Sequence, residues 1–251
     1  MLSLTELSVA LAGRAAVSGV SLTVTRGEVI ALLGANGAGK TTLMRAGLGL
    51  IVPRSGMVRL GGGDPHLLNP RDRALRAAYL PQRPQSIWPI SVEHLVALGR
   101  YAYGAAPERL SGADQAAVDT AIQACSLEKL RSRRMDEISG GEKARAHLAR
   151  AIAQHAPLLM LDEPTAGLDP AQALAVADII RTHAPGGAVV FSTHDVALAA
   201  RTADRLLLLR EGRVVAEGAP SVALTPETLE ATYGRSARID RIGDALTVTF
   251  S

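Results

Sequence analysis

Residues 34–41 read G-A-N-G-A-G-K-T, a spacing of glycine, lysine and threonine that suits the binding of phosphate. Glycines let consecutive backbone N–H groups curve round phosphate oxygens, and a helix that starts here adds its partial positive charge. The pattern predicts that Lys40 contacts the β and γ phosphates of a nucleotide and that the Thr41 hydroxyl ligates Mg²⁺. A glycine-rich turn that matches by chance is the alternative, and the apolar run before Gly34 counts against it. The residues expected to surround the phosphates are Gly34, Ala35, Asn36, Gly37, Ala38, Gly39, Lys40, Thr41 and Thr42.

Two carboxylates follow the apolar run L-L-M-L at 158–161. Asp162 closes that run and is expected to hold Mg²⁺ from the side opposite Thr41. Glu163 is the candidate general base, which would orient and deprotonate the water that attacks the γ-phosphate. A solvated loop carboxylate is the alternative for Glu163.

Two further polar residues also follow predicted strands. His194 in F-S-T-H-D at 191–195 comes directly after an apolar run. A single histidine is usually structural, but the carboxyl ends of parallel strands are where α/β sheets bind ligands. His194 is therefore a candidate catalytic residue. Gln82 in Y-L-P-Q offers a neutral amide to Mg²⁺ or to a catalytic water, which by itself is a weak signal.

Residues 138–146 read I-S-G-G-E-K-A-R-A and indicate the start of a helix. Ser139 and Glu142 have the spacing of a capping box, in which each side chain satisfies an amide at the helix start. A cap is one interpretation of this motif. The other is a second helix start that binds an anion, and the residues alone leave both open.

The elements that must position these residues are indicated by hydrophobic patterning. Continuous apolar runs at 29–33, 158–161, 188–191 and 206–209 predict buried strands, and the helices between them imply a mostly parallel α/β sheet. Residues 2–9 and 20–25 alternate apolar and polar side chains, which predicts half-buried antiparallel strands. The stretch R-E-G-R-V-V-A-E-G at 210–218 predicts a hairpin that turns at Glu211-Gly212.

Residues 85–155 differ in character from the rest of the chain. The strand pattern disappears, and one helical stripe is formed by Ala117, Val118, Ala121, Ile122 and Cys125. The prolines of Y-L-P-Q-R-P-Q exclude a helix just before this region. We expect a helical insertion into the α/β core, with Cys125 as a buried thiol.

The composition is that of an ordered globular protein of one domain, with or without a subdomain: of 251 residues, 47% are hydrophobic and 20% charged. Charges of both signs are interleaved and aromatics make up 3%, which argues against a nucleic-acid partner. The apolar runs fall short of the ~18 residues that span a membrane, and M-L-S-L-T-E-L has no basic start of a signal peptide. A single cysteine fits a reducing compartment. We expect a cytoplasmic protein whose membrane role, if any, comes through a partner.

Taken together, the motifs resemble those of the nucleotide-binding subunit of ABC transporters. The matching pieces stand in the family's order: G-A-N-G-A-G-K-T, Gln82 in Y-L-P-Q, I-S-G-G-E, L-L-M-L-D-E-P, A-G-L-D at 166–169, and His194 in S-T-H-D. The resemblance covers nearly the whole chain and implies a single ATPase domain of α/β class. Its parts would be a RecA-like P-loop NTPase core with an N-terminal antiparallel β subdomain and a C-terminal tail (1–84 and 156–251), and an inserted helical subdomain that carries the signature (85–155).

The resemblance also implies a head-to-tail homodimer with two ATP molecules, each with Mg²⁺, at the interface. Ser139, Gly140 and Gly141 would then face the γ-phosphate held by residues 34–42 of the other chain. Asp169 would contact the same interface, and His194 would contact the γ-phosphate beside Glu163.

Two stretches look like the ATPases of importers for ferric siderophores, haem and cobalamin. They are L-T-P-E-T-L-E-A-T-Y-G-R-S-A-R-I at 224–239 and S-I-W-P-I-S-V-E-H-L-V-A-L-G-R at 86–100. The likeness implies a peripheral subunit on the cytoplasmic face of the cell membrane, a permease that docks near residues 82–103, and a substrate-binding protein. Trp88, Tyr101 and Tyr103 either contact that permease or belong to the subdomain core. The alternatives are another cargo, or a soluble ABC-type ATPase that acts on nucleic acid or ribosomes.

Two positions depart from the family's pattern. The family usually stacks adenine on an aromatic residue, but ungapped counting places Leu11 there, within A-L-A-G-R. Adenine would then pack on aliphatic surface or on Arg14. Ile138 replaces the usual leucine before Ser139, a change that conserves volume and should matter little.

Overall fold

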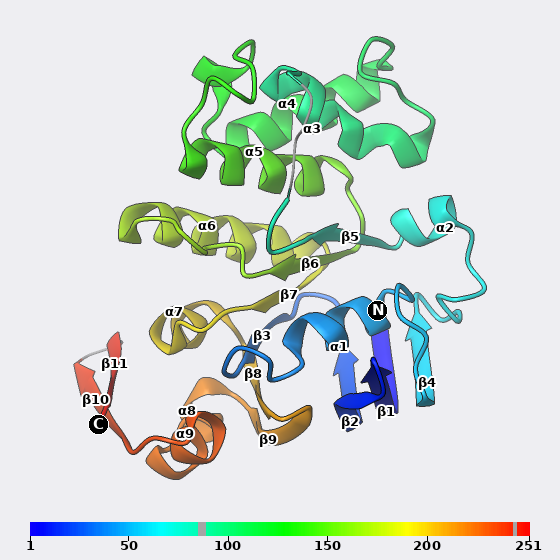
Figure 1. Cartoon of the computed structure of the whole chain (residues 1–251). Helices are drawn as coiled ribbons and strands as arrows, with labels where there is room; N and C mark the ends of the chain where they lie inside the picture. Colours follow the sequence, from blue (N-terminus) through cyan, green and yellow to red (C-terminus); the bar gives the residue numbers. More distant parts are fainter. Residues whose placement is uncertain (85–88, 243–244) are drawn as a thin grey trace.

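A six-stranded sheet forms the centre of the computed structural model, which describes residues 1–84, 89–242 and 245–251 (Figure 1). The strand order is β5-β6-β7-β3-β8-β9. The first five of these strands run parallel, and β9 pairs antiparallel with β8. The strands are β3 (Val29–Leu33), β5 (Ala77–Leu80), β6 (Leu158–Asp162), β7 (Ala188–Ser192), β8 (Arg205–Arg210) and β9 (Arg213–Gly218). The four buried strands predicted from apolar runs are confirmed as β3, β6, β7 and β8.

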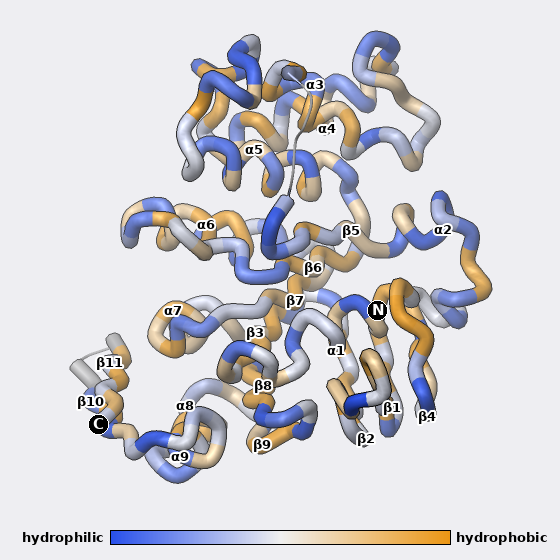
Figure 2. The backbone as a smooth tube through the Cα atoms, viewed as in Figure 1, coloured by the Kyte–Doolittle hydropathy of each residue, from blue (hydrophilic) through white to orange (hydrophobic). Residues whose placement is uncertain are grey.

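The side chains of the central strands alternate between two hydrophobic cores. Val29, Ala31 and Leu33 of β3 point to one core, while Ile30 and Leu32 point to the other. Because both faces are covered, every residue of β3 is buried, which explains the continuous apolar run in its sequence. Figure 2 shows the resulting concentration of apolar residues along the central strands.

The second core is completed by a three-stranded antiparallel sheet of order β2-β1-β4 and by α1 (Lys40–Gly47). Its strands are β1 (Leu2–Leu11), β2 (Arg14–Val24) and β4 (Ser55–Leu60). The predicted pair of antiparallel strands is confirmed as β1 and β2, but both strands are longer than predicted. They continue to a two-residue turn at Ala12 and Gly13, which have φ of 46° and 77°. The strand β4 was not predicted, since Val58 and Leu60 are its only buried residues.

Helices cover the other core and form a layer above the sheet in Figure 1. This layer contains α3 (Val92–Ala97), η1 (Leu98–Tyr103), α4 (Gly112–Ala124), η2 (Glu128–Leu130) and α5 (Gly140–Ala153). The predicted stripe on α4 is confirmed, because its five members are buried against the neighbouring helices. Burial raises the pKa of the Cys125 thiol to about 12, as expected for a thiol of the core.

The remaining elements are α2 (Pro70–Ala74), α6 (Pro170–His183), η3 (Ala184–Gly186), α7 (Val196–Thr202), α8 (Pro220–Ala223), α9 (Pro226–Tyr233), β10 (Ala237–Ile242) and β11 (Ala245–Phe250). Of these, α6, α7 and α9 bury side chains in the core that the helical layer also covers. The predicted hairpin at 210–218 is confirmed: Glu211 and Gly212 form its turn with φ of 50° and 77°. The β10–β11 hairpin, which packs on α7, was not predicted. Within the described ranges, no helix has the length and apolar character needed to cross a bilayer.

Candidate functional site

The glycine loop lies between β3 and α1, as its motif predicts, and is pressed against two other strands. A Cβ at Gly39 would lie 2.5 Å from the Ala16 carbonyl oxygen of β2, and one at Gly34 would lie 2.3 Å from the Leu209 carbonyl oxygen of β8. Both glycines have positive φ, 102° and 149°. Their positions therefore exclude any side chain, while Ala35 and Asn36 between them are exposed.

Lys40 begins α1 and folds back over this loop. Its Nζ donates to the carbonyl oxygens of Gly34 at 2.7 Å and Ala35 at 3.2 Å, and only 6% of the residue is exposed. Burial lowers the pKa of the ammonium, while the charges of Glu163 and Asp162 raise it. The lysine is thus held on the concave side of the loop, with the half-buried Thr41 and Thr42 in the same first helical turn.

Asp162 ends β6 with 1% of its surface exposed. The Ser192 hydroxyl donates to its Oδ1 at 2.7 Å, and the Tyr79 hydroxyl approaches Oδ2 at 3.4 Å. The same Ser192 oxygen accepts the backbone N–H of Glu163 at 2.9 Å. Ser192 and Tyr79 were not among the predicted site residues; their positions within F-S-T-H-D and Y-L-P-Q were the available signal.

Glu163 lies between a cation and an imidazole. Its Oε1 is 3.9 Å from Lys40 Nζ, and its Oε2 is 3.2 Å from Nδ1 of His194. Only 9% of Glu163 is exposed, which does not fit a solvated loop carboxylate, whereas the His194 side chain is 67% exposed. The structure therefore brings together four predicted residues from three different strand ends, with His194 at the outer side.

Gln82 follows the carboxyl end of β5, at the same end of the sheet as the other site residues, and is exposed. Because Leu80 pairs with Leu161, the loop that holds Gln82 begins beside the end of β6, where Asp162 lies. Four residues of its loop, 85–88, are outside the described part of the chain, and Trp88 is one of them.

The signature stretch forms the predicted capping box at the start of α5. The Ser139 backbone N–H donates to Glu142 Oε2 at 2.8 Å, and the Glu142 N–H donates to the Ser139 hydroxyl at 3.3 Å. A Cβ at Gly140 would meet nothing within 4 Å, so this helix start is open, whereas one at Gly141 would lie 2.5 Å from Oε1 of Gln172. The start of α5 thus lies against α6.

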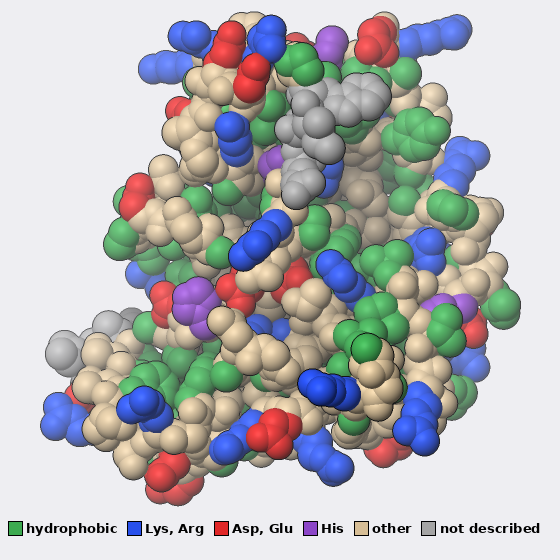
Figure 3. Space-filling view, viewed as in Figure 1, with side chains coloured by type: hydrophobic (Ala, Val, Ile, Leu, Met, Phe, Trp, Pro, Cys, Tyr) green, Lys and Arg blue, Asp and Glu red, His purple; other side chains and the backbone are tan. Residues whose placement is uncertain are grey.

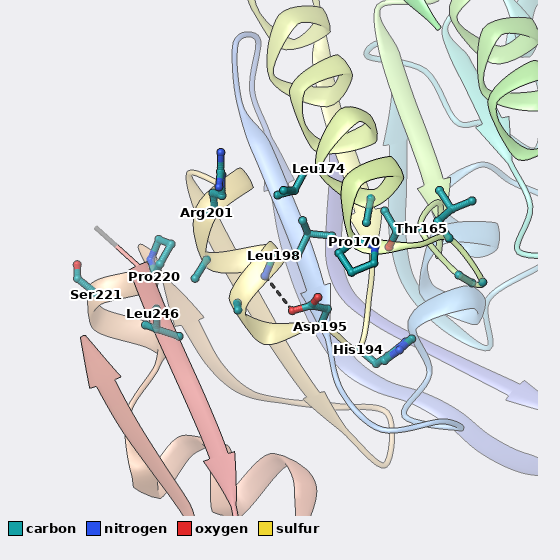
Figure 4. A pocket seen from close by; sticks show the side chains of 16 residues that line it. Thr165, Pro170, Leu174, His194, Asp195, Leu198, Arg201, Pro220, Ser221 and Leu246 are labelled. Carbon is teal, nitrogen blue, oxygen red and sulfur yellow. Dashed lines mark hydrogen bonds between the residues drawn. The ribbon is translucent and has the colours of Figure 1, made fainter. Parts of the chain in front are cut away.

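Asp169 caps α6 by accepting the Gln172 N–H at 2.8 Å. The loop before it, 165–168, lines a pocket of about 1330 Å³ together with His194, α7, α8 and Leu246 of β11 (Figure 4). Asp169 and His194 therefore lie on adjoining segments, but the signature residues lie on a different element.

A second pocket, of about 590 Å³, lies between α2, η1 and the end of α5. Tyr101 lines it and is 77% exposed. The Tyr103 ring instead lies 3.7 Å from the Arg100 guanidinium, which pairs with the buried Asp114 at 2.9 Å. Tyr101 is therefore available to a partner, whereas Tyr103, which is 39% exposed, stacks on Arg100 and is not a core residue.

A buried lysine on a glycine loop between strand and helix, with carboxylates at the end of a nearby parallel strand, defines a P-loop nucleotide hydrolase. Within that class, the chain belongs to the ABC transporter family, whose model matches residues 17–166. The fold is accordingly a RecA-like P-loop core, and the protein is an ATPase.

Similar proteins and structures agree with this assignment. The chain is 40% identical to the hemin import ATP-binding protein HmuV of Bordetella parapertussis over 93% of this chain and 92% of that protein. It is 37% identical to the cobalamin import ATP-binding protein BtuD of Halobacterium salinarum over 99% of this chain and 63% of that protein. A solved transporter described as of the metal-chelate type, in an inward-facing conformation, matches with a TM-score of 0.83 at 26% identity, covering 100% of this chain and 96% of that one.

Proposed function

We propose that this chain is the ATP-hydrolysing subunit of an ABC importer for a metal chelate of the iron-siderophore, haem or cobalamin type. The observation that carries the ATPase chemistry is the position of Glu163 between Lys40 and His194. The cargo class is supported by the hemin and cobalamin import proteins that the chain resembles over more than nine tenths of its length.

The residues of the site have separate tasks in hydrolysis. Lys40 leaves its own loop carbonyls to hold the β and γ phosphates, so its ammonium contributes both affinity and charge stabilisation. Glu163 accepts a proton from the attacking water, and burial keeps that carboxylate away from bulk solvent. His194 contacts the γ-phosphate and, through the 3.2 Å approach of its Nδ1, orients Glu163.

The donor set also fits Mg²⁺. Thr41, Gln82 and Asp162 are the residues that would hold it, and Asp162 Oδ2, with one long 3.4 Å contact to Tyr79, retains capacity for a cation. When bound, Mg²⁺ neutralises charge on the phosphate oxygens.

ATP binding closes a head-to-tail homodimer, and hydrolysis reopens it. Two observations support this arrangement: Ser139 and Gly140 present an open helix start, and this start contacts α6 through Gly141. A helix start carries partial positive charge and favours an anion. Since residues 34–42 serve the chain's own nucleotide, the start of α5, with Asp169 on the adjoining interface, serves the nucleotide of a second copy.

The membrane partner is a permease that docks near residues 82–103. The pocket beside η1 supports this location, because it joins the helical layer (85–155) to the core at α2 and exposes Tyr101. Docking there places the chain on the cytoplasmic face of the cell membrane, where opening and closing of the dimer drives alternating access in the permease. A substrate-binding protein completes the system.

The test is to co-express the chain with the permease encoded beside it and to measure ATP turnover with and without that permease in lipid. We expect the permease to change the turnover rate, and Lys40→Ala to abolish nucleotide binding in both settings. Turnover that is indifferent to the permease, or that requires nucleic acid, would contradict the transport assignment. The face seen in Figure 3 carries acidic and basic side chains side by side, which does not favour a polyanionic partner.

A further inference from the structure

Ser192, the last residue of β7, is fully buried beside the two carboxylates of the candidate site. Its backbone lies between two strands, in register with Asp162 of β6 on one side and with Leu32 of β3 on the other. Directly after it, the Thr193 N–H donates to the Leu32 carbonyl oxygen at 3.1 Å. Because one rotatable bond joins the serine oxygen to this backbone, the sheet itself fixes where the hydroxyl lies.

The Ser192 hydroxyl makes one hydrogen bond to each of the two carboxylate residues. It donates to Asp162 Oδ1 at 2.7 Å and accepts the backbone N–H of Glu163 at 2.9 Å. A serine hydroxyl has one proton to donate and two lone pairs that accept. Since the carboxylate takes that proton, and an amide N–H can only donate, the hydroxyl has no proton left for a phosphate or a water.

Each of these bonds constrains a different part of the site. At Asp162 the bond engages Oδ1 and leaves Oδ2, with its long 3.4 Å contact to Tyr79, facing away from the serine. At Glu163 it anchors a strained backbone, with φ of 50°, whose carboxylate lies 3.9 Å from Lys40 Nζ. The union of β6 and β7 does not depend on either bond, because the two backbones already pair in register along the whole of β6.

We propose that Ser192 is a positioning residue that, through one hydroxyl, orients Asp162 as a ligand of Mg²⁺ and Glu163 as the general base. A shared hydrogen-bond partner fixes the base relative to the metal ligand, which two independent contacts would not do. His194 follows two residues later on the same segment, so the end of β7 supports all three groups. This inference rests on the proposed roles of Asp162 and Glu163 in hydrolysis.

Ser192→Ala removes the hydroxyl and keeps a small side chain in the strand. Turnover should fall about ten- to a hundredfold, the effect of one hydrogen bond to a charged group. The Kd for a non-hydrolysable ATP analogue without Mg²⁺, measured by calorimetry on the full chain, should stay the same, because residues 34–42 bind the phosphates. Adding Mg²⁺ should then strengthen binding by a smaller factor than in the wild-type chain, since Asp162 is no longer held in one orientation.

Ser192→Thr and Ser192→Val form a pair that separates the hydroxyl from the shape of the side chain. Both residues are branched, have similar outlines and suit a strand, but only threonine keeps the hydroxyl. Ser192→Thr should therefore turn over ATP at least about fivefold faster than Ser192→Val. Equal turnover in the two variants would contradict a role for the hydroxyl.

Thr232→Val controls for the loss of a buried hydrogen bond as such. The Thr232 hydroxyl, in α9, is buried and donates to the Thr228 carbonyl oxygen at 2.6 Å. Its removal should lower the melting temperature but change neither turnover nor the effect of Mg²⁺ on binding. Wild-type turnover in Ser192→Ala, or an equal loss in Thr232→Val, would overturn the role of Ser192 and leave the ATPase assignment intact. Undiminished turnover in Glu163→Gln would instead overturn the general base on which the inference rests.

Discussion

Glu163 has a left-handed backbone, with φ of 50°, at the point where β6 ends. For a residue with a side chain, such a conformation costs on the order of 1–3 kcal/mol and persists only where the surroundings enforce it. Here its N–H is held by Ser192, and its carboxylate lies between Lys40 and His194. In this conformation the carboxylate lies beside Lys40 of the phosphate loop, whereas a side chain in extended backbone would point to one face of the sheet.

Leu11 is the position at which the sequence predicts contact with the adenine base. It ends β1 beside the Ala12–Gly13 turn and is 44% exposed, so a larger side chain fits without disturbing the core. Leu11→Tyr should lower the Kd for ATP at least fivefold if the base packs there, since stacking on an aromatic ring contributes about 1–3 kcal/mol. Calorimetry with ATP in the absence of turnover measures it.

Leu67→Tyr, at an 85% exposed leucine in the loop before α2, is the control for Leu11→Tyr and should leave the Kd unchanged. Equal affinities in all three proteins would show that adenine lies away from Leu11.

At the scale of elements, the sequence predicts best what a short window of residues contains. Buried strands such as β3 are visible as apolar runs because both faces are covered. The strand β4 has two buried residues and is defined by its pairing with β1, which no local pattern reveals. In the C-terminal hairpin, apolar and polar residues alternate in A-R-I-D-R-I and A-L-T-V-T-F. This strand pattern is visible in the sequence, but the sequence prediction overlooked it.

The residues of the site also fall into two groups, those that a local motif predicts and those that only the fold reveals. Lys40, Asp162, Glu163 and His194 belong to motifs in which neighbouring residues supply the context. Ser192 and Tyr79 reach Asp162 only through contacts made between distant segments, so their hydroxyls cannot be distinguished from other hydroxyls before the fold is known.

The start of α5 offers a test at this scale. Gly140 is open, so Gly140→Asp should fold normally, and its charge suits a free helix start. The same charge would repel the phosphate of a second copy. We expect ATP binding to be retained, while ATP-dependent dimerisation and hydrolysis are lost; light scattering and a turnover assay measure these.

Gly112→Asp is a closely matched control. Gly112 occupies the same position in α4, directly after the capping Ser111, and a Cβ there also meets nothing within 4 Å. It should be fully active. Full activity in Gly140→Asp as well would leave the Ser139 motif as a helix cap alone.

In the whole molecule, one chain presents two helix starts suited to anions on different layers. The start of α1 carries Lys40, which approaches Glu163, and the start of α5 lies beside α6. In the proposed head-to-tail dimer, each α5 start would face the partner's phosphate, so that ATP itself would join the two copies.

Glu163→Gln tests this arrangement, because it removes the proton acceptor and keeps the shape of the side chain. Hydrolysis should fall at least about 100-fold, as expected on loss of a general base. ATP should remain bound through Lys40, and a dimer should accumulate in saturating ATP, as measured by light scattering. Glu128→Gln, at an exposed position of η2, should turn over ATP and stay in exchange between monomer and dimer. Adding Gly140→Asp to Glu163→Gln should abolish the trapped dimer; a dimer that survives it, or a monomeric Glu163→Gln, would contradict a nucleotide shared between two chains.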